Sequence, residues 1–451
     1  MYEQVEMAES LKNTMDEDHY NLQRKAVRRA EFALTSIQDQ LSSIVRWFKT
    51  NPENGPAGAV GLKRTALKYA FNKKKLDESI EEFEKWQGIQ DMTWLLTLQV
   101  VKTVYQRDGM PHGLTPSVEQ VVKAEFVADE KGLSLQHEVL ASITVTDIPY
   151  FDGKYGIRKQ DHMILDTIIF TQLSKWEMNQ SIVEVRDLVR KLRKDTQSVG
   201  LLEPKGFFKE ADESGSIRFM IPFPLPNNLT QPQSLRAALL STTGPNLTTK
   251  IGIGLDLASC VSHMHILNFV HKNIRPETIL LFNNTATNSI STYLVGFQDF
   301  RKDGGRTALL GDDDWAKNIY RHPRRFGTKP GDAYIMQHDI YSLGVCLLEI
   351  GLWSPLVEYP DPATRNPSAH LDPESFFSGV TMKNRLLLLA ERHLPHNMGT
   401  LYTDVVKTCL TCLDEDNGDF GDDSEFYDED GILVGIRYIE KVLLQLKDIR
   451  V

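Results

Sequence analysis

The polar residues that could do chemistry gather in one segment, between residues 271 and 299. It begins with the run HKNIRPETILL (271–281), which follows an apolar stretch expected to form a helix. His271 could act as an acid or a base, but we interpret it as a core histidine with satisfied hydrogen bonds. Asn273 carries an amide, which has no proton affinity near neutral pH and cannot serve as a general base.

This run resembles the catalytic loop of protein kinases, H-R-D-L-K-P-E-N-I-L-L, in order and register. Further along, YRHPR (320–324) resembles the end of the kinase activation segment, usually A-P-E, with Pro323 and Arg324 as its last two positions. The run DIYSLGV (339–345) resembles the start of the central helix of the larger kinase lobe. The resemblance implies an α+β, two-lobed protein-kinase-like fold.

The same resemblance implies that catalysis is lost. A kinase needs an Asp that accepts the substrate proton, and an Asn and the D-F-G Asp that hold magnesium. The corresponding positions here are Asn273, Thr278 and Gly296. Loss of a general base alone slows a reaction by ~10²–10⁴, and loss of the metal ligands removes charge neutralisation as well. No catalytic residue is intact, which predicts a pseudokinase.

Other motif residues are implied to be structural. Asp339 resembles the kinase Asp that accepts hydrogen bonds from the catalytic-loop backbone, and His271 resembles the buried histidine of that loop. Arg324 stands where the A-P-E glutamate pairs with an arginine in kinases. We therefore predict a charge-swapped contact between Arg324 and the acidic residues 414–416, stabilising by at most ~1 kcal/mol if exposed.

Two other sequences could be mistaken for the magnesium motif. Asp299-Phe300-Arg301 would be a shifted D-F-G if the hairpin expected from strands near 279–282 and 292–295 were three residues longer. Asp419-Phe420-Gly421 spells D-F-G but lies far beyond the central helix, and we interpret it as an acidic surface loop.

The region before residue 225 offers little for a nucleotide. The nearest approach to a glycine-rich loop is Gly153-Lys154-Tyr155-Gly156, and the strand expected at 162–170 contains no lysine to pair with a helix residue such as Glu184. We therefore expect no required cofactor, and leave open ATP binding without magnesium.

Composition excludes several classes of protein. The net charge of −10 argues against nucleic-acid binding, which needs a basic face. Four cysteines are too few for a disulfide scaffold, and the pair Cys409 and Cys412 lacks the two further ligands that zinc needs. The N-terminus is polar, and no apolar run reaches the ~18–20 residues that span a bilayer. These features predict a cytoplasmic protein.

Apolar periodicity predicts helices at the start of the chain. One stripe runs from Leu22 to Phe48 at steps of three or four, and the run NPENGPAGAVG (51–61) should end that helix. A second helix is expected around 67–83 and a third around 92–104, which together would form a partial antiparallel bundle.

These signals divide the chain into five segments. They are a polar tail (1–16), a helical domain (17–106), a linker (107–120), a kinase-like N-lobe (121–225) and a kinase-like C-lobe (226–451) with an acidic loop (414–430).

A narrower resemblance concerns fungal proteins. The runs TYLVGFQDFR (292–301) and IYRHPRR (319–325) are similar to kinase-like domains of filamentous-fungal proteins that carry an N-terminal HeLo-type helical domain, and residues 62–86 are similar to later HeLo helices. The resemblance implies a place in fungal incompatibility, in prion-inhibition and propagation, or in regulated cell death. HeLo domains open with an apolar, glycine-rich helix, whereas this chain begins MYEQVEMAES, so the HeLo-like part is partial.

Three functions follow as hypotheses. The first is a regulatory or signalling pseudokinase that binds unidentified proteins, with self-association through 17–106. The second is an atypical Ser/Thr kinase that binds ATP and uses Asp299. The third is a membrane-acting cell-death effector, in which the basic cluster from Lys63 to Lys75 meets anionic lipid. We favour a solvated helix face for that cluster, and expect the apolar stripes to pack on protein rather than enter lipid.

Overall fold

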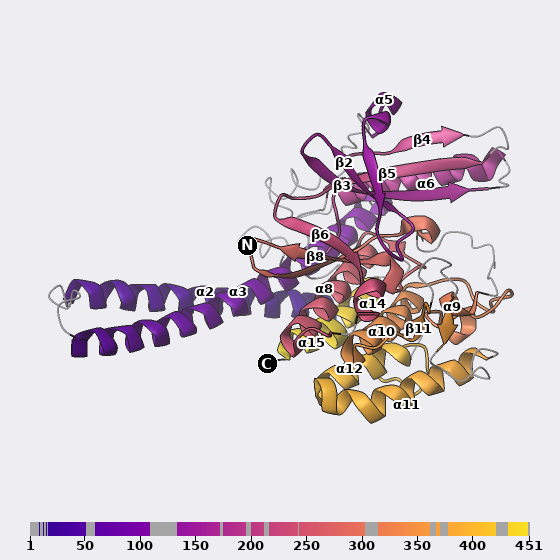
Figure 1. The fold of residues 1–451 in the computed structure, drawn as a ribbon. Helices are drawn as coiled ribbons and strands as arrows, with labels where there is room; N and C mark the ends of the chain where they lie inside the picture. The colour runs from indigo at the N-terminus through magenta and orange to yellow at the C-terminus, as the bar shows by residue number, and fades with distance from the viewer. Residues whose placement is uncertain are drawn as a thin grey trace. The chain divides into compact units, whose positions relative to one another are not determined.

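A computed structural model describes most of the chain. The described residues are 9, 12, 15, 17–50, 59–108, 133–171, 175–194, 200–211, 216–241, 243–302, 314–360, 367–369, 378–420 and 432–449. The chain divides into two compact units, Met1–Val127 and Ala128–Val451 (Figure 1). Most of the tail expected at 1–16, the expected linker beyond residue 108, and residues 421–430 of the expected acidic loop lie outside the described residues.

The first unit is built on two long helices, α2 (Glu17–Thr50) and α3 (Ala59–Asp108), which pack against each other. The expected stripe on α2 is buried over its first part, at Leu22, Ala26 and Ala30, because apolar residues at this spacing share one helix face. Helices α2 and α3 run antiparallel, since Thr97 bonds to Gln23 near one end and Ser79 bonds to Gln40 near the other.

The expectation of a third helix in this unit is wrong. Residues 67–83 and 92–104 both belong to α3, which is one continuous helix of 50 residues. The only potential breaker between them is Gly88, and a single glycine lowers helix stability by only ~1 kcal/mol relative to alanine. The described part of the unit is therefore a two-helix hairpin rather than a three-helix bundle. The expected stripe also ends early, because Leu41 is 46% exposed.

The second unit starts with a five-stranded antiparallel sheet in the order β1-β2-β3-β5-β4. Its strands are β1 (Thr144–Asp147), β2 (Lys154–Arg158), β3 (Asp161–Phe170), β4 (Phe208–Ala211) and β5 (Ile217–Pro224). A short helix, α5 (His137–Ala141), precedes the sheet, and α6 (Lys175–Lys194) lies between β3 and β4 in sequence.

Strands β3 and β5 bury one face of this sheet, and the middle of β3 is buried on both faces, since Met163 to Asp166 are all buried. Ile164 and Ile168 on β3 have no exposed surface, and neither do Phe219 and Phe223 on β5. Side chains two residues apart point to the same face of a strand, so each pair lines one side of the sheet. Helix α6 supplies its own apolar residues to the core: Val185, Leu188, Val189 and Leu192 are all buried.

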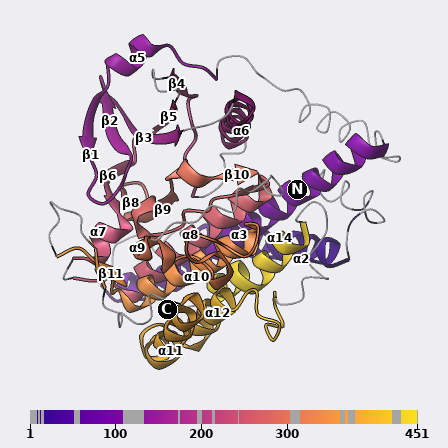
Figure 2. The same cartoon turned by 90° about the vertical axis from the view of Figure 1, so that its right-hand side faces the viewer.

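The rest of the second unit is mainly helical. Its longer helices are α8 (Leu247–Ile266), α10 (Met336–Leu352), α11 (Gly379–Met398) and α12 (Thr400–Leu410). Two shorter helices, α14 (Ile432–Tyr438) and α15 (Leu444–Asp448), follow them. Residues Met336 to Gly351 of α10 are all buried, as expected of a helix that is apolar on every side. Helices α8, α11 and α12 pack around it, and they lie away from the five-stranded sheet (Figure 2).

Short elements connect these helices to a second sheet. Its three antiparallel strands, in the order β6-β8-β9, are β6 (Leu229–Ser234), β8 (Ile279–Asn284) and β9 (Ser289–Leu294). Two-residue strands pair as β7 (Phe269–Val270) with β10 (Arg301–Lys302), and as β11 (Val357–Glu358) with β12 (Ser368–Ala369). The short helices are α7 (Leu235–Leu239) and α9 (Trp315–Asn318).

The chain therefore belongs to the α+β class, with a helical region followed by antiparallel sheets and further helices. None of the helices in the described ranges is both long and apolar enough to cross a membrane.

Candidate functional site

The loop from His271 to Thr278 connects β7 to β8, and its backbone is hydrogen-bonded to Asp339. This carboxylate lies in the first turn of α10, is fully buried, and accepts the backbone N–H of His271 at 2.7 Å and of Lys272 at 3.0 Å. Tyr334 and His265 also donate to it, at 2.8 and 3.3 Å. Burial alone would raise the pKa of Asp339, but these hydrogen bonds, led by that from His265, lower it below the ordinary value.

The backbone of this loop is bent sharply at Lys272, whose φ of 65° lies in the left-handed region. That conformation is costly for a residue with a side chain. Asp339 accepts the N–H of Lys272 and that of the residue before it, and these two bonds hold the bend in place. The sequence resemblance implied that Asp339 accepts hydrogen bonds from the backbone of this loop, and the structure contains those bonds.

His271 is buried and packs its ring 5.2 Å from that of Phe297. Its Nδ1 faces the backbone N–H of Asn273 at 3.3 Å. Burial lowers the pKa of His271 to about 4, against a smaller raising effect of Asp339. The imidazole is therefore neutral at physiological pH and serves as part of the packed interior.

Asn273 and Thr278, which the sequence resemblance predicted to be degraded catalytic positions, bond to neighbouring groups of the protein. Thr278 donates its hydroxyl to the carbonyl of Asn273 at 2.6 Å. Asn273 donates its amide to the carbonyl of Gly296 at 3.3 Å and accepts from Arg275 Nε at 2.9 Å. Both side chains thus stabilise the loop itself.

Gly296, the third of these predicted positions, begins a tight turn after β9. Its φ of 81° favours glycine, and a Cβ there would lie 2.4 Å from Thr278 Cγ2. The 3₁₀ turn Phe297–Asp299 follows. The backbone N–H groups of Gly296 and Phe297 both donate to one oxygen of Asp166, each at 2.8 Å.

Asp166 was not among the residues predicted from the sequence. It lies in the middle of β3 and is fully buried. Burial raises its pKa to about 6, although the hydrogen bonds from Phe297 and Gly296 act in the opposite direction. The signal that could have identified it is a lone acidic residue inside the apolar run MILDTIIF, because buried acidic groups need partners.

The structure separates Asp299 from the loop's interior. The hairpin of β8 and β9 ends at Leu294, and Asp299 is exposed at the end of the 3₁₀ turn. Phe297 is the ring against His271, whereas Phe300 packs at 5.7 Å from Phe269. Asp419 forms an ion pair with Lys441 at 2.7 Å, and its neighbour Phe420 is buried rather than part of a solvated loop.

The turn between β1 and β2 contacts Arg275 of the loop and residues beside it. Ser234 donates to the carbonyl of Pro149 at 2.6 Å, Tyr150 packs 4.9 Å from Tyr359, and Arg275 reaches Asp152 at 3.5 Å. Gly153 and Gly156, the nearest approach to a glycine-rich loop in the sequence, follow these residues along the chain. Gly153 has no room for a side chain, since a Cβ would meet the carbonyl oxygen of Leu165 at 2.6 Å, and Gly156 lies inside β2.

A buried ionic network lies beside the loop and was also missed from the sequence. Arg236 on α7 has no exposed surface and donates to Glu277 at 2.8 Å, to Glu349 at 3.1 Å and to the carbonyl of Val357 at 2.9 Å. Burial alone would raise the pKa of Glu277, but Arg236 and Arg275 lower it to about 2. The network joins α7, the loop and α10.

The predicted contact of Arg324 with the acidic cluster is wrong. Asp414 instead pairs with Lys383 at 2.5 Å. Arg324 lies in the 3₁₀ turn that begins at Pro323, and it donates to the carbonyl of Leu413 at 3.2 Å. Among the described residues, it forms a half-exposed ion pair with Asp332 at 3.7 Å. The 3₁₀ turn that contains Arg324 is therefore fixed beside residues 414–416 by a hydrogen bond to the carbonyl of Leu413. A backbone carbonyl cannot be predicted as a partner from the charges in the sequence.

Two further sequence observations have a place in the structure. Glu184 on α6 accepts from Gln180 of the same helix at 3.4 Å. Within the described ranges, no three His, Cys, Asp or Glu side chains gather closely enough to hold a metal ion. Cys409 and Cys412 are both buried, and Cys412 donates to the carbonyl of Gln337 at 3.1 Å.

Comparison with models of known protein families gave no match.

Proposed function

We propose that this chain is a regulatory pseudokinase, which acts by binding other proteins and transfers no phosphate. The observation that carries the proposal is the carboxylate of Asp166, which accepts the N–H groups of Gly296 and Phe297 at 2.8 Å each. In the kinase motif, this turn would carry the D-F-G aspartate and its metal ion. Here a carboxylate from the sheet keeps the turn in shape without nucleotide or metal.

The order of elements supports a kinase-like, two-lobed arrangement as part of this proposal. A five-stranded antiparallel sheet with one helix between its third and fourth strands precedes the larger helical part. The loop at 271–278, the β8–β9 hairpin, the turn at Phe297 and the buried α10 then follow in the order of the kinase motifs. Asp339 bonds to the loop as the corresponding kinase residue would.

Charge around the loop supports the loss of catalysis. In kinases, a lysine on the third strand and magnesium ions neutralise the phosphates. Strand β3 contains no lysine, and its buried polar residue is Asp166. Asp152 adds a second carboxylate close to Arg275. Polyphosphate would meet negative charge where a kinase places positive charge, and like charges repel most strongly where water is scarce.

Retention of the scaffold without the chemistry suggests a binding or switching role. The resemblance to fungal HeLo-associated proteins extends the proposal to regulated cell death or incompatibility, with the α2–α3 hairpin as the element under control. Proteins, including a second copy of this chain, are the proposed partners.

The proposal is tested by thermal unfolding of the full chain with ATP, in the presence and absence of magnesium. We expect no magnesium-dependent stabilisation, and no transfer from labelled ATP to a generic protein substrate. An equal stabilisation by ATP with and without magnesium would leave the pseudokinase in place and add a nucleotide ligand.

The Asp299→Ala variant separates the atypical kinase from the pseudokinase. Because Asp299 is exposed at the end of a turn, we expect its substitution to leave the unfolding temperature unchanged in every condition. A magnesium-dependent stabilisation of the natural chain that disappears in this variant would overturn the proposal and favour the kinase.

A further inference from the structure

One side of the α2–α3 hairpin exposes large apolar side chains, which are Leu34 (38% exposed), Leu41 (46%) and Ile80 (36%). Gln40 and Ser79 face each other across the hairpin, where the Gln40 amide donates to the Ser79 hydroxyl at 2.8 Å. Leu41 and Ile80 each come one residue later, and in two antiparallel helices that step of about 100° turns both side chains to the same side of the pair. Leu34 is two turns before Leu41 and shares its helix face. The three side chains therefore form one surface, the apolar face.

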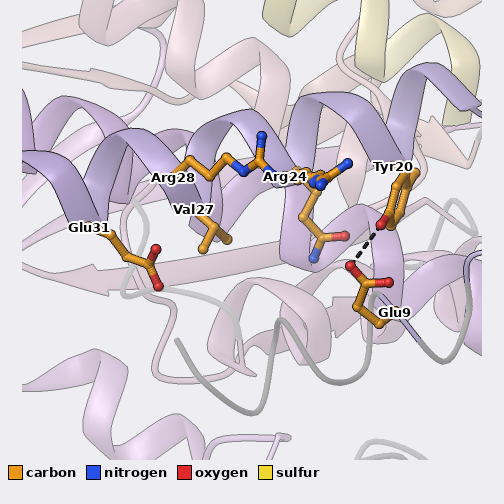
Figure 3. Close-up of a pocket in the computed structure, with 7 residues that line it drawn as sticks. Glu9, Tyr20, Arg24, Val27, Arg28 and Glu31 are labelled. Atoms are coloured by element: carbon orange, nitrogen blue, oxygen red, sulfur yellow. Dashed lines mark hydrogen bonds between the residues drawn. The ribbon is translucent and has the colours of Figure 1, made fainter.

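The apolar face begins where the polar start of α2 ends. Figure 3 shows that start, where Tyr20 donates its hydroxyl to Glu9 at 2.7 Å and mostly polar side chains line a cavity of about 230 Å³. Glu31 is the last lining residue along the helix, and Leu34 follows it three residues later. The apolar face thus has a polar edge on α2, as protein interfaces have.

On α3, the stripe of residues that contains Ile80 is complementary to itself. Lys73, Leu76, Ile80 and Glu84 follow one another at steps of three or four, so they share one side of the helix. Their order is positive, apolar, apolar, negative. Lys73 and Glu84 are exposed, and neither forms an ion pair with another described residue.

A second copy of α3 in the antiparallel direction matches this stripe at each position. With a two-fold axis at the level of Glu78, Lys73 lies opposite Glu84 of the second copy, and Leu76 lies opposite its Ile80. The axis repeats both contacts, as in every two-fold interface. A parallel pairing would instead place Lys73 against Lys73 and Glu84 against Glu84, and like charges repel.

We propose that the apolar face joins two copies of this chain, with α3 antiparallel to α3 of the second copy. The two hairpins then form a four-helix bundle, in which each helix is covered on two sides. A single two-helix hairpin covers one side of each helix, and the second hairpin covers Leu34, Leu41 and Ile80. This inference deepens the proposed function, on which it rests for its regulatory meaning, by identifying a second copy of the chain as the partner of the hairpin.

Analytical ultracentrifugation of the full chain over a range of concentrations tests the proposal. We expect a reversible dimer. Ile80→Gln should weaken it about tenfold or more, because the two-fold axis makes each substitution remove two apolar contacts. Circular dichroism checks that the helices of the variant remain intact.

Reversal of the charged pair tests the direction of the helices. Lys73→Glu alone and Glu84→Lys alone should each weaken the dimer about tenfold, because each makes two attractive contacts repulsive. The variant with both substitutions should recover the original affinity within about threefold. The matched control is Lys74→Glu, which makes the same change of charge on another side of α3, where Lys74 pairs with Glu78 at 3.9 Å. It should leave the affinity within about twofold.

Two results would overturn the inference. One is a monomer at every concentration, and a lowered unfolding temperature of Ile80→Gln would then assign the cover of the apolar face to another part of the same chain. The other is a dimer that the double charge reversal fails to restore, because Lys73 would then not face Glu84. Neither result bears on phosphate transfer, whereas magnesium-dependent stabilisation by ATP would overturn the proposed function and leave the dimer in place.

Discussion

Asp166 joins β3 to the turn after β9 through a single carboxylate oxygen, and this makes it testable by one substitution. Asp166→Ala leaves two buried N–H groups without an acceptor, which should lower the free energy of unfolding by about 1–3 kcal/mol. Asp166→Asn keeps a carbonyl acceptor and should cost less. Chemical denaturation followed by fluorescence measures both.

Asp161 at the exposed start of the same strand provides the control. Asp161→Ala should change stability by less than about 0.5 kcal/mol, as is usual for surface positions. If Asp161→Ala and Asp166→Ala unfold at the same denaturant concentration, Asp166 does not hold the turn.

Glu349 compensates a buried arginine, and its removal should have a larger effect than that of any surface acid. In Glu349→Ala, Arg236 retains Glu277 but loses its bond to α10. Breaking a buried pair by removing one partner costs about 3–5 kcal/mol. The comparison is Glu391→Ala, which breaks an exposed pair with Lys407 at 2.9 Å and should cost at most about 1 kcal/mol. Denaturation midpoints that differ little between the two variants would contradict this account.

At the scale of elements, α10 and α12 pack closely at Gly344. A Cβ at this position would lie 2.7 Å from Cys409 Cβ and 3.2 Å from the backbone nitrogen of Leu410. Gly344→Ala should therefore destabilise the chain by about 1–3 kcal/mol through overpacking. Gly252 on α8 has nothing within 4 Å of such a Cβ, so Gly252→Ala should stabilise by about 0.5–1 kcal/mol through helix propensity. Thermal unfolding of both variants should give shifts of opposite sign, and equal signs would refute the packing argument.

Elements with a strong local pattern could be predicted from the sequence. The stripe on α2 was expected near its observed position because apolar periodicity acts locally, whereas the β8–β9 hairpin was expected from the resemblance to kinases. The prediction of a third helix was wrong, because the sequence between 83 and 92 has no strong helix breaker and α3 continues through it.

The missed site residues depend on contacts between distant segments. Arg236 is 113 residues from Glu349, and Asp166 is 130 residues from Gly296. In the sequence, Arg236 is an ordinary charged residue, and Asp166 is marked only by its place inside an apolar run. Arg324 was recognised by motif, but its partner is a backbone carbonyl, which carries no sequence signal at all.

At the scale of the whole molecule, buried histidines make stability depend on pH. Burial lowers the pKa of four of them, to about 4 for His263 and His271, about 3 for His338 and about 2 for His322. In the unfolded chain, the pKa of histidine is about 6.5. Below this pH, the histidines bind protons in the unfolded chain but not in the folded chain. Their contribution to folding stability is therefore present above about pH 6.5 and is lost as the pH falls.

Two buried carboxyl groups act in the opposite direction. Burial raises the pKa of Asp166 to about 6 and that of Asp256 to about 7. Their contribution is greatest at low pH and is lost as the pH rises through these values. Burial also raises the pKa of Glu349. The four histidines outweigh these three carboxyls, so stability should fall from pH 6.5 to 5, by on the order of 1 kcal/mol per pH unit. Urea midpoints at pH 7, 6 and 5 measure the slope, and a flat or inverted series would contradict it.

The buried network around Arg236 also has a consequence for synthesis on the ribosome. Arg236 is made 113 residues before Glu349 and 121 before Val357. At ~5–20 residues per second, this leaves it without those partners for roughly 6–20 s. The second unit therefore cannot complete its interior until translation has passed α10, whereas the α2–α3 hairpin has all its residues by Asp108. Newly made chains would expose the unfinished interior of the second unit during that interval, which is when chaperones would act on it.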